Sequence, residues 1–156
     1  MLKKILLICL FTGICAAQKT ALSTSAANTA EKLYRTTDVD SKPEIKEGMY
    51  TLPLFVSQNF KLPNVHNYKV KLFIGFVVET DGSITNIRFI HQNVTPLREG
   101  SVIDEEQKKK DSALLDTMKP ESVRVMTAFN KLWVPAMKDG KPVRCQYNYP
   151  MNFNLE

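Results

Sequence analysis

The chain has 156 residues, of which 44% are apolar and 24% are charged, so it is long enough for one modest hydrophobic core but not for two. Its formal charge of +5 falls to +3 when Lys3 and Lys4 are removed with a leader. The remaining basic residues are mixed with acidic ones and do not cluster, so the sequence does not indicate a nucleic-acid partner. The densest basic run, 108–110, is separated from three acidic residues at 104–106 by Gln107 alone and is typical of a solvated loop or helix face.

The first residues have the pattern of an export signal. Lys3 and Lys4 precede an apolar run over 5–17, and small residues at its end offer a cleavage site before Gln18. The run is shorter than the roughly 20 apolar residues of a membrane span. The sequence therefore predicts a signal peptide over 1–17. An uncleaved membrane anchor is one alternative, and a lipoprotein attached through Cys15 is another, although the bulky residue before Cys15 disfavours it.

The segment after the leader has a different composition from the rest of the chain. Residues 18–47 are rich in Ser, Thr, Ala and Lys, and Tyr34 is their one aromatic residue. This composition predicts a flexible tether, with the folded domain over 48–156. Cys145 is the single cysteine beyond the leader, so an internal disulfide in the domain is excluded.

The first elements of the domain are a short helix and a hairpin. Pro53 suits the first turn of a helix within 52–60, and the Leu62–Pro63 pair would end it. Alternating apolar residues predict a strand over 70–78. Asp81–Gly82 provides the positive φ of a hairpin turn, and 84–90 is the return strand, with a bulge near Asn86 to explain its weaker alternation.

A long polar segment separates the hairpin from a second helix. Residues 93–118 lack clear periodicity and predict an extended loop, with at most a short helix within it. Pro120 and Glu121 then suit the first turn of a helix that Pro135 would end. Its apolar stripe would face a sheet and includes Val125, Met126, Phe129, Leu132 and Trp133.

The clearest pattern lies at the end of the chain, after a turn at 139–142. Between 143 and 155, apolar or aromatic residues alternate strictly with polar ones, which predicts a long strand buried on one face. Cys145 falls on the apolar face and is expected to be buried and unreactive. Pro150 has no N–H for a ladder, which favours an edge position or a bulge. An exposed edge is able to accept a peptide as an added strand.

Four segments, in order, resemble the C-terminal domain of TonB in the form common in Bacteroidetes, over about 52–155. Residues 59–63 (Asn-Phe-Lys-Leu-Pro) correspond to the family's Asn-x-x-Tyr-Pro, and 75–84 correspond to its strand, Asp-Gly turn and strand. Residues 133–143 contain the Trp-x-Pro and Gly-Lys-Pro-Val signature, and 149–153 match the closing strand with its proline.

The resemblance implies a fold, a function and a location. The fold is α+β, with two helices packed on one face of a three-stranded antiparallel sheet. Proteins of this family bind the N-terminal peptide of a TonB-dependent outer-membrane transporter as an added strand, in the periplasm. An inner-membrane proton-driven motor complex then supplies the energy for transport. The peptide-binding residues implied here are Leu62, Pro63, Arg144, Gln146, Asn148, Pro150 and Asn152.

The chain also departs from the family pattern. Leu62 replaces the usual tyrosine, the 93–118 segment is longer than usual, and no Pro-rich spacer occurs in the sequence. A soluble envelope adaptor with the same fold but without energy coupling is therefore the alternative, and a homodimer through the edge strand is a further possibility. No nucleophile–base set or His/Cys/acid cluster stands at informative spacing, so we expect no enzyme activity, no cofactor and no metal.

Overall fold

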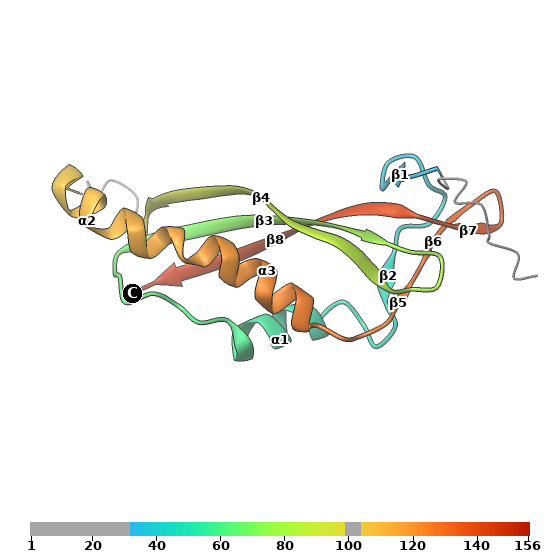
Figure 1. The fold of residues 1–156 in the computed structure, drawn as a ribbon, viewed down its shortest axis with the longest axis horizontal. Helices are drawn as coiled ribbons and strands as arrows, with labels where there is room; N and C mark the ends of the chain where they lie inside the picture. Colours follow the sequence, from blue (N-terminus) through green and yellow to red (C-terminus); the bar gives the residue numbers. More distant parts are fainter. Residues whose placement is uncertain (1–31, 99–103) are drawn as a thin grey trace, which may run out of the picture.

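The computed structural model describes residues 32–98 and 104–156, and the predicted signal peptide and the start of the expected tether lie outside the described residues. The described residues form an α+β fold in which a long, curled sheet lies over helices (Figure 1). None of the helices in this part of the chain combines the length and the apolar character needed to cross a membrane.

The main sheet has four strands rather than the expected three. β3 (Tyr68–Val78) pairs antiparallel with β4 (Ile84–Pro96) on one side and with β8 (Cys145–Leu155) on the other. These long strands are the predicted antiparallel sheet. The fourth strand is β1 (Tyr34–Arg35), which pairs parallel with the start of β8, so the strand order is β1-β8-β3-β4.

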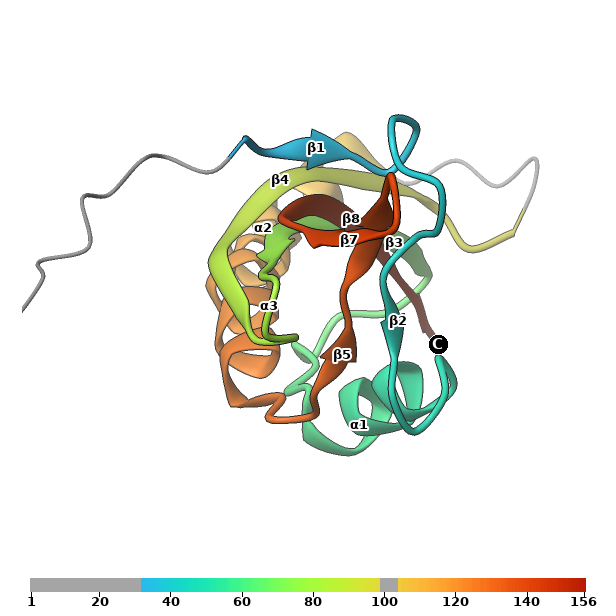
Figure 2. The same ribbon diagram turned by 90° about the vertical axis from the view of Figure 1, so that its right-hand side faces the viewer.

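The β3–β4 hairpin confirms the predicted turn and bulge. Gly82 has a φ of 84°, and its N–H donates to the carbonyl of Glu79. Asn86 has a φ of 52°, and the β3–β4 register shifts beside it. A second shift follows near Ile90, and β4 then continues well beyond the predicted end at residue 90. The two bulges increase the twist and curl of the sheet, which Figure 2 shows end-on.

Two helices cover the inner face of the sheet. α1 (Thr51–Asn59) forms where the sequence predicts it, with Pro53 in its first turn. α3 (Met118–Ala128) begins two residues before Pro120. Their buried side chains join those of the central strand in one core, whose largest fully buried members include Tyr68, Phe76, Leu52, Leu72, Ile74, Met118 and Met126.

The prediction of an extended loop over 93–118 is wrong for most of its length, although it allowed for a short helix within the segment. β4 occupies its start, and a third helix, α2 (Glu105–Asp116), occupies its end. α2 buries only Asp111 and Leu115, so it has no apolar stripe that the sequence could reveal. Its N-terminus is capped by the Asp104 carboxylate, which accepts a hydrogen bond from the N–H of Glu106. Asp111 accepts a hydrogen bond from the hydroxyl of Tyr68 at 2.9 Å, which holds α2 against the sheet.

The described part of the expected tether belongs to the fold. Besides β1, residues 32–47 contain β2 (Glu44–Ile45), which pairs with β5 (Trp133–Val134). The side chain of Ile45 is buried in the core. The Asp40 carboxylate accepts the N–H of Asp139 at 2.7 Å, and this bond lowers the pKa of Asp40. Strands of two residues carry no periodicity, which is why composition alone predicted a tether.

The predicted end of the second helix at Pro135 is also wrong. α3 ends at Ala128, because Phe129 already has extended dihedral angles. Trp133 instead lies in β5, where its backbone N–H donates to the carbonyl of Gly82 at 2.9 Å. β6 (Ala136–Lys138) and β7 (Lys141–Val143) then form a hairpin, whose two turn residues both have positive φ, as the Asp-Gly pair predicts.

Candidate functional site

Most of the outer edge of β8 is open. β1 pairs only with Cys145 and Gln146, and no other described strand lies beside β8 on that side. Figure 1 shows β8 running away from β1 toward the C-terminus. An unpaired strand edge presents free backbone donors and acceptors to any extended chain that approaches it.

The backbone groups that face this edge follow from one hydrogen bond. The N–H of Tyr34 donates to the carbonyl of Arg144 at 3.0 Å, so the backbone of Arg144 points outward. The β3–β8 register is regular, and the backbone groups of successive residues in a strand point to opposite sides. The even-numbered residues of β8 therefore face outward. Pro150 is one of them, so its missing N–H leaves the ladder with β3 intact, while Asn148 and Asn152 present both groups.

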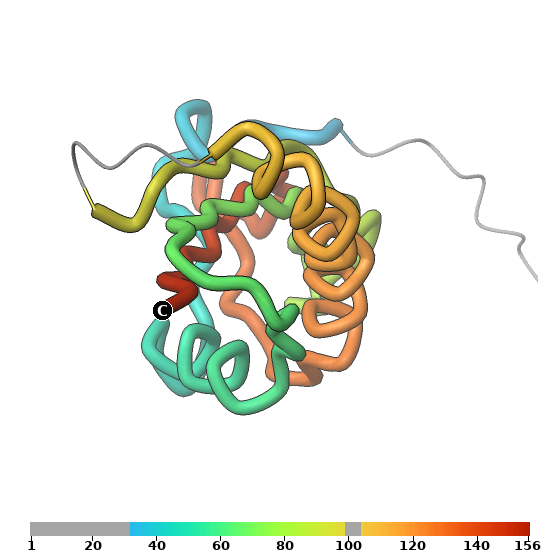
Figure 3. Tube along the Cα trace, turned by 90° about the vertical axis from the view of Figure 1, so that its left-hand side faces the viewer, coloured from blue at the N-terminus to red at the C-terminus, as the bar shows by residue number. Residues whose placement is uncertain are grey.

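A groove of about 320 Å³ lies beside the open edge, on the helix side of the sheet. Pro53, Val56 and Ser57 of α1 form one wall, Phe60 and Leu62 extend it, and residues 149–153 of β8 form the other. Figure 3 shows α1 and the end of β8 on the same side of the molecule, away from α3.

The wall of the groove after α1 is tied to α3. The N–H of Lys61 donates to the Glu121 carboxylate at 2.8 Å, and the Arg124 guanidinium donates to the carbonyl of Asn59 at 2.7 Å. Glu121 and Arg124 also form an ion pair with each other, and its hydrogen bonds lower the pKa of Glu121. These bonds anchor the end of α1 and the residues after it to α3. Phe60, which has extended dihedral angles, packs against Phe153 with 4.4 Å between the ring centroids.

The groove brings together three of the seven residues predicted for peptide binding: Leu62, Pro150 and Asn152. Leu62 is 53% exposed, which is high for a leucine beside an apolar groove. Pro63 is half-buried next to it, and Asn148 is exposed at the neighbouring outward position of β8. The sequence did not indicate Val56, Phe60, Tyr149 or Phe153 as lining residues, although Phe60 lies within the motif that contains Leu62.

Arg144 and Gln146 lie at the other end of β8. The Arg144 guanidinium donates to both carboxylate oxygens of Glu79, at 2.5 and 3.0 Å, and this interaction lowers the pKa of Glu79. Gln146 pairs with Arg35 of β1 and borders a separate polar hollow of about 610 Å³. Cys145 is buried, as expected, and its burial raises the pKa of the thiol.

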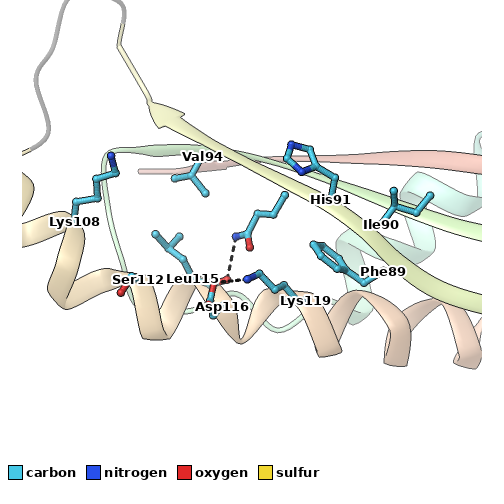
Figure 4. Close-up of a pocket in the computed structure, with 10 residues that line it drawn as sticks. Phe89, Ile90, His91, Val94, Lys108, Ser112, Leu115, Asp116 and Lys119 are labelled. Carbon is cyan, nitrogen blue, oxygen red and sulfur yellow. Dashed lines mark hydrogen bonds and ion pairs between the residues drawn. The ribbon is translucent and has the colours of Figure 1, made fainter.

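A second hollow, of about 400 Å³, lies between β4 and the helices α2 and α3 (Figure 4). Phe89, Val94 and Leu115 form its apolar part. Two of its polar groups bond within the protein. Lys119 pairs with Asp116 at 2.8 Å, and the side-chain amide of Gln92 donates to the carbonyl of Leu115 at 3.1 Å. Within 32–98 and 104–156, no group of three or more His, Cys, Asp or Glu side chains is arranged to hold a metal ion.

The fold and this site define a small α+β domain in which the open edge of β8 lies beside an apolar groove. No protein-family model and no curated protein matches the chain. The resemblance to the TonB C-terminal domain therefore depends on the four segments of the sequence described above.

Proposed function

We propose that this protein captures an extended peptide as an added strand on the outer edge of β8, between Tyr147 and Leu155. The observation that carries the proposal is the open edge itself, with its outward backbone groups at Asn148, Pro150 and Asn152. Strand addition obtains affinity from backbone hydrogen bonds and specificity from pockets for alternate side chains. Here the groove beside residues 149–153 is such a pocket.

The resemblance to TonB supplies the partner in this proposal. The captured peptide is the N-terminal segment of an outer-membrane transporter in the periplasm, and capture serves energy-coupled transport through a motor complex in the inner membrane. Supporting this, Leu62, Pro150 and Asn152, three of the residues that the resemblance implies, border one groove.

The second candidate is an envelope adaptor that captures peptides without a motor. The packing of residues 34–45 onto the domain favours it, because this shortens the segment that was expected to act as a tether. Cell fractionation and N-terminal sequencing of the mature protein separate the two candidates. A form anchored in the inner membrane supports energy coupling, and a free form with a processed N-terminus supports the adaptor.

The variant Asn152→Pro tests strand addition at this edge. It removes one outward N–H and leaves the hydrogen bonds between β3 and β8 intact, because residue 152, like Pro150, directs its backbone groups away from β3. We expect it to weaken binding of fluorescent N-terminal transporter peptides about tenfold, because one lost hydrogen bond of about 1–1.5 kcal/mol corresponds to that factor. Asn152→Ala keeps the N–H and is the matched control, with less than about a twofold change expected.

Two outcomes contradict the proposal. The first is that no transporter peptide binds the parent protein in fluorescence anisotropy. The second is that Asn152→Pro and Asn152→Ala bind equally well while circular dichroism shows both variants to be folded.

A further inference from the structure

An added strand on β8 would meet two different environments. Successive side chains of a strand point to opposite faces of the sheet, so every second side chain of the peptide would face the helix side and the others would face the outer side. Next to residues 149–153, the helix side contains the groove, and the outer side contains the uncovered face of the sheet (Figure 1).

The groove suits apolar side chains. Its walls are formed mainly by Val56, Phe60, Leu62 and the core-facing residues of β8. The hydroxyl of Ser57 already donates to the carbonyl of Leu54 at 2.8 Å, so it offers no free donor to a ligand. A volume of about 320 Å³ is at the lower end for pockets that hold whole small molecules, and it suits side chains of a bound segment. A charged side chain placed there would be desolvated without a partner.

The outer face of the sheet has the opposite character. β3, β4 and β8 contain no Asp or Glu, whereas Lys69, Lys71, Arg88 and His91 are exposed on them. Lys69 and Lys71 form no ion pair among the described residues. The Nζ of Lys71 lies 5.0 Å from the centroid of the Phe73 ring.

The cations of β3 lie within reach of an added strand. Lys71 is directly opposite Asn152 in the β3–β8 register, and Lys69 is opposite Asn154. A strand added to β8 would lie about 10 Å from β3, because neighbouring strands are about 4.8 Å apart. A lysine and a glutamate side chain are together long enough to span that distance.

The same charges disfavour a second copy of this chain as the occupant of the edge. Two β8 edges that paired with each other would bring the Lys69 and Lys71 side chains of both copies onto one continuous sheet, with no acid in the three long strands of either copy. Like charges brought together across an interface suppress pairing.

We infer that the captured segment alternates apolar with acidic residues, with its apolar side chains in the groove and its carboxylates over the outer face near Lys69 and Lys71. This inference rests on the proposed function and specifies the chemistry of its ligand.

Three synthetic peptides test the inference. The first alternates Val and Glu over six residues, the second has Ser in place of Val, and the third has Lys in place of Glu. We expect the Ser peptide to bind at least about tenfold more weakly than the first, because it loses apolar burial in the groove. The Lys peptide should bind about fivefold more weakly at low salt, with the difference shrinking at high salt.

Protein variants assign these effects to the two faces. Ser57→Trp fills the groove and should weaken binding of the Val–Glu peptide about tenfold, whereas Gln58→Trp, at an exposed neighbouring position outside the groove, should not. Leu62→Ser shortens an exposed wall and provides a second test if Ser57→Trp unfolds the domain. Lys71→Gln should reduce the preference for Glu over Lys peptides, and Lys109→Gln on the exposed face of α2 is its control.

The outcomes separate this inference from the proposed function. Equal binding of all three peptides, each weakened by Asn152→Pro, would overturn the alternating pattern and leave strand capture standing. The same conclusion follows if transporter peptides bind and the Val–Glu peptide does not. Failure of the transporter peptides and of all three synthetic peptides would overturn both.

Discussion

The ion pair between Glu79 and Arg144 joins the end of β3 to the start of β8, and its contribution to stability is open to direct measurement. The two hydrogen bonds of 2.5 and 3.0 Å are charge-assisted, and the two side chains are only 18% and 25% exposed. The hydroxyl of Thr85 also donates to Glu79. Glu79→Gln keeps the shape of the side chain and removes its charge. We expect it to lower the free energy of unfolding by about 2 kcal/mol at pH 7, the usual worth of a hydrogen bond to a charged group.

The stabilisation by the Glu79–Arg144 pair should depend on pH, in a direction set by the pKa shift of Glu79. The hydrogen bond from Arg144 lowers the pKa of Glu79 in the folded state, so in the acid range the unfolded state binds more protons. The stabilisation is complete above the ordinary pKa of about 4.3 and is lost as the pH falls through the lower folded-state pKa. Urea unfolding from pH 7 downward should therefore show the difference between parent and Glu79→Gln narrowing in acid.

The control for this measurement is an exposed pair on α2. Glu106 and Lys110 lie 3.0 Å apart with most of their side chains in solvent, so Glu106→Gln should change stability by less than about 0.5 kcal/mol. A loss for Glu79→Gln that is the same at every pH, or no greater than that of Glu106→Gln, would refute the reasoning.

Two further predictions concern the tip of the β3–β4 hairpin, where it contacts β5. Trp133→Ala should lower the free energy of unfolding by about 3–5 kcal/mol in chemical denaturation, because the indole ring packs against Phe76 and Tyr147. Trp133→Phe should cost less than about 1.5 kcal/mol, because it keeps an aromatic ring and the Nε1 that it removes has no hydrogen-bond partner among the described residues. Equal losses for both would contradict this account. Gly82→Ala would place a Cβ 2.1 Å from the carbonyl oxygen of Trp133 at a φ of +84°, and it should lower the free energy of unfolding by at least about 2 kcal/mol. Gly140→Ala is the control: Gly140 also has a positive φ, but no atom lies within 4 Å of the added Cβ. It should therefore lower the thermal midpoint less than Gly82→Ala does.

The elements that the sequence predicted well are those with local signals. β3 and β8 each bury one face against the helices, so their apolar residues alternate along the chain. The turns at Gly82 and Gly140 require positive φ, and the Asp-Gly pair at each turn predicts it. The bulge at Asn86 was predicted because it interrupts an otherwise regular alternation.

The elements that the sequence missed depend on distant partners. β1 and β2 have two residues each, and they are strands only because β8 and β5 lie beside them. α2 is polar on most of its surface and is held by a cap, by surface ion pairs and by the buried Asp111, none of which produces an apolar stripe.

The candidate site shows the same division. The sequence by itself predicts a strand over 143–155 that is buried on one face, and the structure begins this strand two residues later, at Cys145. The sequence also indicates that Pro150 lacks a donor for a neighbouring strand, because alternation and a missing N–H are local properties. Only the tertiary structure decided that β1 covers the start of that edge and leaves the remainder open. It also placed Phe60 and Leu62 beside Tyr149 and Phe153. Those contacts join segments far apart in the chain, and they are set by the packing of α1 against α3, which no local pattern encodes.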